Sequence, residues 1–178
     1  MSLAQSLSTE FDREMATTRR LLERVPDDRL AWQPHAKSMT LGRLASHLAD
    51  LPGRGSDILG KESLDVARPG GPAPAETQSP KLQSGQNVQS GAEILERFDR
   101  NVAAAREALA AASDEAFRQP WTLSSGGREI LTLPRAAMLR TILFSHMIHH
   151  RGQLSVYLRL NDIPVPPIYG PSADESPF

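Results

Sequence analysis

The sequence predicts an all-α fold in which four helices form a bundle, with a long crossover between the second and third helices and a small hairpin before the fourth. Three observations lead to this prediction. Four segments repeat apolar residues at steps of three and four. A long segment rich in Pro, Gly, Gln and Ser separates the second from the third, and two short β-prone arms flank Ser-Ser-Gly-Gly ahead of the fourth. We expect residues 1–178 to form a single domain, because a chain of 178 residues buries a core without metal or disulfide staples.

The first two helices are predicted from their apolar stripes. Residues 3–25 form the first helix, and Pro26 with the two aspartates after it ends it. Its stripe contains Leu3, Leu7, Phe11, Met15, Leu22 and Val25. The second helix begins near residues 38–40, is kinked or interrupted at Pro52 and Gly53, and then resumes. Its stripe contains Leu41, Leu44, Leu48 and Leu51.

The third helix follows a long crossover, residues 65–90, that is nearly free of large apolar side chains. A loop of this length usually covers a functional site or makes a topological crossing. Ser90 and Glu93 have the spacing of a capping box, which begins the third helix. The stripe of this helix contains Ile94, Phe98, Val102, Ala105 and Leu109.

The fourth helix is preceded by the predicted hairpin, residues 121–133. Pro134 suits the first turn of a helix, because its missing N–H would have no partner there. We expect this helix to run to about Leu160, with Asn161 and a Pro-rich tail after it. The sequence shows no internal repeat and no second domain.

Composition and charge exclude several classes of protein. The chain has no cysteine, so any metal site must be built from imidazole, carboxylate and water. A formal net charge of −1 and a pI of about 6.5 argue against nucleic acid as a partner. The polar N-terminus does not resemble a signal peptide, and no apolar run approaches the length of a membrane span. We therefore expect a cytoplasmic protein with no membrane partner.

Three of the five histidines lie together in the fourth helix, in the run FSHMIHHRGQL. At about 100° per residue, with His146 as the origin, His150 lies near +40° and His149 near −60°. His146 and His150 are therefore predicted to point into the bundle from the middle of the apolar face. Two imidazoles four residues apart on a helix can chelate one divalent ion. The alternative is a pair of core histidines held by hydrogen bonds, but each buried ring then needs its own partners.

His47 in the second helix is the candidate for a third ligand. It borders the buried face of that helix, and helical bundles commonly build metal sites from ligands on facing helices. His149 is an alternative ligand, although its angle places it at the packing edge. Asp50 is a candidate supporting carboxylate, with a solvated helix-end charge as the alternative. His35 follows a proline in a connector, where a surface or capping role is expected.

Three stretches of the chain carry a family resemblance: WQPHAKSMTLGRLASHLADLPG, PWTLSSGGREILTLPRAAMLR and HMIHHRGQLSVYLRLNDIPVPPIYGPSADE. Together they resemble the DinB/YfiT-like metalloenzyme superfamily over nearly the full chain, and the His-x-x-His-His-Arg-Gly-Gln run is the most specific element. The resemblance implies a four-helix bundle in up-down-down-up order with a long crossover between helices two and three. It also implies a homodimer and a metal held by three histidines, which in this sequence are His47, His146 and His150.

Three functions are compatible with such a site. Three neutral imidazoles leave a coordination position open, which is typical of catalytic metal sites. The cofactor is expected to be a divalent transition metal, zinc or nickel, although imidazole also suits iron and copper. The first function is a metal-dependent transferase that uses a small-molecule thiol, as relatives of the bundle such as mycothiol-dependent isomerases and bacillithiol transferases do. The alternatives are a metal-dependent hydrolase and a non-enzymatic protein with a structural metal, and the catalytic residues are left unassigned.

Other residues of the fourth helix have predicted roles. Gln153 and Tyr157 share the histidine face and are candidates to orient the rings, with plain packing as the alternative for both. Arg151 points away from the site and is expected to pair with a carboxylate or with a partner chain. Phe144 and Ile148 lie opposite the histidines, so this helix is apolar nearly all round. The helix is therefore either central to the fold or in contact with a second copy of the chain, and we expect a homodimer contact.

Overall fold

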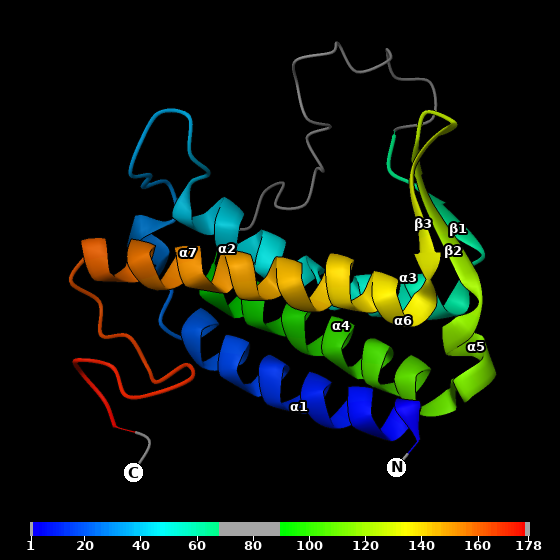
Figure 1. Ribbon diagram of the computed structural model, residues 1–178. Helices are drawn as coiled ribbons and strands as arrows, with labels where there is room; N and C mark the ends of the chain where they lie inside the picture. The colour runs from blue at the N-terminus through cyan, green and yellow to red at the C-terminus, as the bar shows by residue number, and fades with distance from the viewer. Residues whose placement is uncertain (1, 68–89, 177–178) are drawn as a thin grey trace.

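The computed structural model describes residues 2–67 and 90–176, and this part of the chain is mainly helical (Figure 1). The helices are α1 (Leu3–Leu22), α2 (Leu41–Asp50), α3 (Gly53–Gly60), α4 (Gly91–Ala111), α5 (Asp114–Arg118), α6 (Arg135–Met138) and α7 (His146–Leu160). A π-helical segment, Leu139–Ser145, joins α6 to α7, and a 3-10 turn, Asp27–Arg29, follows α1. Apart from its two ends, the predicted crossover lies outside the described residues. No helix within the described ranges is long and apolar enough to cross a membrane.

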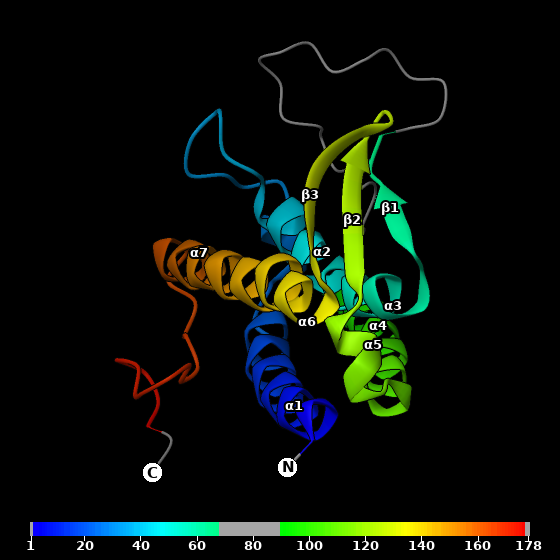
Figure 2. The same ribbon diagram turned by 45° about the vertical axis from the view of Figure 1, so that its right-hand side comes forward.

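The long helical segments lie side by side (Figures 1 and 2). α4 packs against α1 on one side and against α2 and α3 on the other, while α7 contacts α2 and α1. The colours of Figure 1 show that α1 runs in one direction, α2, α3 and α4 run in the opposite direction, and α6 with α7 returns in the direction of α1. The helices thus have the directions of the up-down-down-up order that the resemblance implies.

Two local predictions about helix ends agree with the structure. The hydroxyl of Ser90 accepts a hydrogen bond from the N–H of Glu93 at 3.2 Å, so Ser90 caps the start of α4 as the sequence predicts. α2 ends before Pro52, and α3 begins at Gly53, so the predicted interruption is also confirmed.

A three-stranded sheet accompanies the helices, so the all-α prediction is wrong in this respect. The strands are β1 (Ser63–Asp65), β2 (Pro120–Ser125) and β3 (Arg128–Pro134), in the order β1-β2-β3. β2 and β3 form the predicted antiparallel hairpin, and β1 pairs with β2 in parallel. β1 has no counterpart among the predicted elements, because three residues are too few to show the alternation of a strand. Figure 2 shows the sheet standing at the end of the helices where α3 ends and α6 begins.

Two glycines and one aspartate fix the hairpin turn. Gly126 and Gly127 have φ angles of 60° and 78°, a conformation that side chains disfavour and that matches the twist of a two-residue hairpin turn. The Asp65 carboxylate accepts hydrogen bonds from the N–H groups of Gly127, Ala67 and Gly126 at 2.7, 2.9 and 2.9 Å. These bonds, that from Gly127 first, lower the pKa of Asp65. The end of β1 is thereby tied to the hairpin turn.

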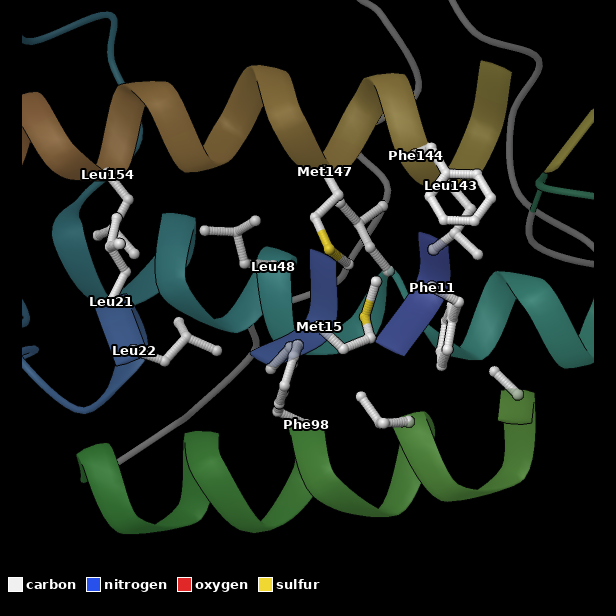
Figure 3. Packing of buried hydrophobic residues seen from close by; sticks show 14 of the residues in the cluster. Phe11, Met15, Leu21, Leu22, Leu48, Phe98, Leu143, Phe144, Met147 and Leu154 are labelled. Carbon is white, nitrogen blue, oxygen red and sulfur yellow. The ribbon is translucent and has the colours of Figure 1, made fainter. Parts of the chain in front are cut away.

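The core lies between the helices (Figure 3). It covers most of that side of the α6–α7 segment which faces away from the histidines. Phe144 meets Phe11 of α1 edge to face, with ring centroids 6.4 Å apart. Phe144, Met147 and Leu158 are at most 2% exposed, so these residues are not available to a second copy of the chain. Ile148 is different, because 38% of it is exposed. The all-round apolar pattern of this helix therefore reflects mainly its central position.

Candidate metal centre

Three histidines from two facing helices come together where α2 packs against α7. His47 lies on α2, His146 is the first residue of α7, and His150 lies one turn later. One ring nitrogen of each lies within 4.8 Å of the other two. The structure therefore places side by side the three residues that the sequence selects as metal ligands. No carboxylate belongs to this cluster in the described part of the chain.

The spacing of the rings suits a single metal ion. Nε2 of His47 lies 3.2 Å from Nε2 of His146. Two nitrogens bound tetrahedrally to one zinc ion, each at about 2.0–2.1 Å, are about 3.3 Å apart. The ring of His150 lies beside both others, with centroids 4.5 Å from His47 and 4.7 Å from His146. The donor set, three imidazoles at these separations, therefore fits a divalent transition metal.

Burial keeps the three imidazoles neutral. It lowers the pKa of His47 to about 3, with smaller contributions from the neighbouring His150 and His146. It lowers the pKa of His146 to about 4, again with a contribution from His150. Burial also lowers the pKa of His150, although a hydrogen bond to Gln153 opposes this shift. Because only the neutral ring binds a metal, protons compete for these nitrogens at lower pH than they do for an ordinary histidine.

Hydrogen bonds fix the orientation of two of the rings. Nδ1 of His150 lies 2.7 Å from Oε1 of Gln153, so the ring donates from Nδ1 and leaves Nε2 for a metal. The His146 ring hydrogen-bonds to the backbone of Ile142. Because Nε2 of His146 faces His47, Nδ1 is the nitrogen in position for that bond. Gln153 thus makes the contact that the sequence predicts for it, whereas the sequence does not predict the contact of Ile142.

The π-helical segment Leu139–Ser145 ends directly before His146. At this junction the backbone N–H of His146 donates to the carbonyl of Leu143, whereas an α-helix would direct it to Ile142. The His146 ring, rather than the His146 amide, therefore uses the Ile142 carbonyl. Such π-helical turns are frequent at functional sites. The sequence gives no signal for this one, since the segment contains neither Pro nor Gly and its apolar residues also fit an α-helical period.

Three other predicted candidates make contacts of their own or are exposed, and are not part of the cluster. Tyr157 packs edge to face against Trp32, with ring centroids 5.5 Å apart, which is the packing alternative that the sequence leaves open. Asp50 forms an ion pair with Arg97 at 3.5 Å and is not a member of the cluster. His35 is exposed in the connector before α2, as expected.

The two residues that flank His150 differ in their surroundings. His149 is exposed, and its ring centroid lies 4.9 Å from that of His150, but it does not belong to the cluster. Arg151 is buried and pairs with the carboxylate of Glu14 at 2.6 Å. The prediction that Arg151 pairs with a carboxylate is therefore confirmed.

A pocket opens beside the cluster, between the α2–α3 segment, the π-helical segment and the sheet. His47 and His146 form one part of its wall, together with Asp50 and Arg54. The remaining lining side chains are apolar. Arg54 is not among the candidates that the sequence provides, because its spacing is that of any solvated helix charge.

Comparisons with known proteins agree with this fold. The sequence profile of the DinB family matches residues 1–177. The uncharacterized protein YrdA of Bacillus subtilis (strain 168) is 26% identical over 172 residues, which cover 94% of this chain and 87% of YrdA.

Two solved structures have a similar fold. A DinB-like protein from Bacillus cereus ATCC 10987 has a TM-score of 0.64 and 20% identity, over 90% of this chain and 94% of that one. A DinB-like protein from Bacillus subtilis, YjoA, has a TM-score of 0.65 and 16% identity, over 97% and 96% of the two chains. From the match of the family profile to nearly every residue, we conclude that the chain belongs to the DinB family.

Proposed function

We propose that His47, His146 and His150 bind one divalent transition metal, zinc or nickel, and that the protein is a metal-dependent transferase that uses a low-molecular-weight thiol. One observation carries this proposal: three imidazoles converge without a carboxylate among the described residues. Three ligands leave at least one position of a four-coordinate metal for a further ligand. Reduced thiols of this kind are abundant in the cytoplasm, where we place the protein.

The residues of the site favour an anionic sulfur ligand. A divalent metal supplies Lewis acidity that lowers the pKa of a bound thiol or water. The three imidazoles add no negative charge, so a divalent metal bound to them keeps its charge of +2 and attracts a thiolate. Gln153 and the Ile142 carbonyl keep the rings in place while that ligand binds and leaves.

The hydrolase alternative is less well supported by the surroundings of the cluster. A hydrolase of this type needs an acid or base within hydrogen-bond reach of the metal-bound water. Asp50 is the candidate from the sequence and lines the same pocket as His47 and His146, but its carboxylate forms an ion pair with Arg97 and is not part of the cluster. The structural-metal alternative is also less well supported, because a structural zinc site commonly has four protein ligands, whereas the cluster in the described part of the chain offers three beside a pocket.

A cobalt(II)-loaded protein tests the thiol proposal. We expect glutathione and mercaptoethanol to shift the visible spectrum of the cobalt and to add a sulfur-to-cobalt charge-transfer band, with one thiol per metal. S-methylglutathione, which cannot form a thiolate, is the control and should leave the spectrum unchanged. If cobalt binds at one ion per chain but no thiol alters its spectrum, the thiol function is wrong. Unfolding of the chain on chelation, with no thiol response, would point to a structural metal.

We also propose that the protein is a homodimer through the exposed face of α7. Ile148, Val156 and Leu160 are 38%, 55% and 57% exposed, and their spacing of eight and four residues places them along one face of the helix. Gly152 lies between them, and a Cβ at this position would meet no atom within 4 Å, so a second helix can approach closely. An apolar stripe of this kind is typical of a contact with a second copy.

Sedimentation equilibrium tests the dimer. We expect the wild-type chain to sediment as a dimer and Val156→Glu as a monomer, because the variant would bury an unpaired charge at the contact. Ile130→Glu is the matched control, since Ile130 is also exposed, by 53%, but lies on the hairpin. A wild-type monomer, or equal dissociation of the two variants, would contradict the assignment of this face.

A further inference from the structure

The pocket beside the histidines has a charged end and an apolar end. The charged end carries His47, His146, Asp50 and Arg54. The wall that the sheet contributes is apolar. We propose that this pocket binds a small organic monocarboxylate, whose apolar body lies against the sheet and whose carboxylate lies at Arg54. This molecule would be the second substrate of the thiol transferase, so the inference rests on the proposed function for its role in a reaction, but not for binding.

The apolar wall is contributed by elements far apart in the sequence. Leu64 comes from β1, and Trp121 and Leu123 come from β2. Because β1 pairs with β2 in the register Leu64↔Leu123, these two leucines are direct neighbours in the sheet. Trp121 is only 1% exposed, so it is a fixed part of the wall. The sheet therefore has a role that a helical bundle alone would not supply: it closes one side of the pocket.

The charged end favours an anion. The guanidinium of Arg54 forms an ion pair with Asp57 at 3.3 Å, which is its one side-chain hydrogen bond among the described residues, and a guanidinium has five N–H donors. Asp57 is shared with Lys61 at 2.6 Å, and Asp50 pairs with Arg97 at 3.5 Å, so the three cations Arg54, Lys61 and Arg97 outnumber the two carboxylates at this end. A metal on the neighbouring histidines would add two positive charges. A carboxylate is the small anion that matches the planar fork of an arginine.

The apolar wall does not suit the thiol itself. Low-molecular-weight thiols carry amide, carboxylate or sugar groups along most of their length, and burying such groups without partners costs free energy. The empty space in and in front of the pocket is about 490 Å³, and because part of it is open solvent, the enclosed part holds only a small molecule. A single ring or a short alkyl chain with one carboxylate is therefore the fitting occupant, and the thiol approaches from outside the pocket.

Isothermal titration calorimetry on the zinc-loaded full chain tests this inference. We expect hydrocinnamate to bind at one site, acetate to bind at least about tenfold more weakly because it lacks the apolar body, and phenethylamine not to bind because its charge is opposite. Leu123→Trp, which fills the pocket, and Arg54→Met, which removes the charge, should each weaken hydrocinnamate by about tenfold or more. Ile130→Trp is the control on the exposed part of the same hairpin and should leave binding unchanged.

The outcomes separate this inference from the proposed function. The pocket inference is wrong if hydrocinnamate binds no better than acetate, or if it binds equally well to the wild type and to both pocket variants. If thiols perturb the cobalt spectrum in that case, the thiol function stands. If hydrocinnamate binds and both pocket variants weaken it, the inference holds even where thiols have no effect on the metal. Thermal unfolding of each variant checks that the chain is folded, and Arg54→Met decides the question if Leu123→Trp does not fold.

Discussion

Replacement of Arg151 by methionine is expected to lower the free energy of unfolding by about 3–5 kcal/mol, because it leaves the Glu14 carboxylate buried without its positive partner. The side chain of Arg151 is 1% exposed and that of Glu14 is 10% exposed, so water cannot replace the lost contact. The guanidinium also donates to the backbone carbonyl of Glu14 at 3.1 Å and to the Thr18 hydroxyl at 3.2 Å. The pair therefore joins α7 to α1 inside the protein.

The C-terminal tail takes part in the same network. The hydroxyl of Tyr169 donates to the Glu14 carboxylate at 3.0 Å and accepts a hydrogen bond from Arg151. The Arg151 guanidinium lies 5.0 Å from the centre of the Tyr169 ring. Loss of the arginine should therefore loosen the tail as well as the contact between the two helices.

Urea unfolding of three variants separates the ion pair from simple packing. Arg151→Met and Glu14→Met should each be strongly destabilised, while the double variant should be less destabilised than the sum of the two, because it leaves no unpaired buried charge. Arg140→Met is the control, since Arg140 pairs with Glu10 on the surface and such pairs contribute about 0–1 kcal/mol. If Arg151→Met changes the unfolding free energy as little as Arg140→Met, the network does not stabilise the fold.

The helices were predictable from sequence because their stability comes from amphipathic stripes. Burial requires an apolar residue every three or four positions, so the spacing of Leu41, Leu44 and Leu48 is enough to indicate a helix, and all three are buried. The capping hydroxyl of Ser90 marks the start of α4 for a similar reason, since it acts within one turn of its own chain. Local causes of this kind leave local signals.

Features that depend on distant contacts left no such signal. β1 is three residues long and exists because Leu64 pairs with Leu123, which is far away along the chain. The pocket beside the histidines is formed only when this sheet packs against the helices, so neither Arg54 nor Trp121 could be assigned to it from the sequence. The exposed stripe of α7 could not be separated from its buried sides either, because the helix is apolar nearly all round.

The histidine cluster lies between these two cases. His146 and His150 are four residues apart on one helix, so their proximity follows from helix geometry alone. His47 joins them only because α2 packs against α7. The sequence placed it at the border of a buried face, and the resemblance to a known family supplied the rest. The π-helical segment that precedes His146 and shifts the hydrogen bonding of Ile142 was not visible in either.

Replacement of His146 by alanine is expected to abolish metal binding, from about one zinc or nickel ion per chain in the wild type to none after dialysis. Two histidines and solvent remain, and the loss of a direct ligand should exceed the 10–100-fold effect of removing a group that only orients a ligand. His47→Ala should behave in the same way.

Plasma mass spectrometry of the chain, purified without a histidine tag, measures the stoichiometry of the metal. The thermal shift on adding zinc measures the affinity independently. A metal bound at 100 times its Kd stabilises the fold by about 2.7 kcal/mol, so a shift in the wild type that is absent in His146→Ala reports binding to the folded site.

Two further variants make this result specific to the cluster. His149→Ala removes an exposed imidazole that lies next to His150 but outside the cluster, so this variant should keep its metal. Gln153→Leu keeps all three ligands but removes the acceptor for Nδ1 of His150, so we expect it to retain metal with an affinity reduced about 10–100-fold. A graded series of this kind, from wild type and His149→Ala through Gln153→Leu to His146→Ala, is expected only if the metal binds to the three rings in the arrangement seen here. Equal loss of metal in His149→Ala and His146→Ala would contradict it, because a site that responds to any missing imidazole on α7 would not be the buried cluster.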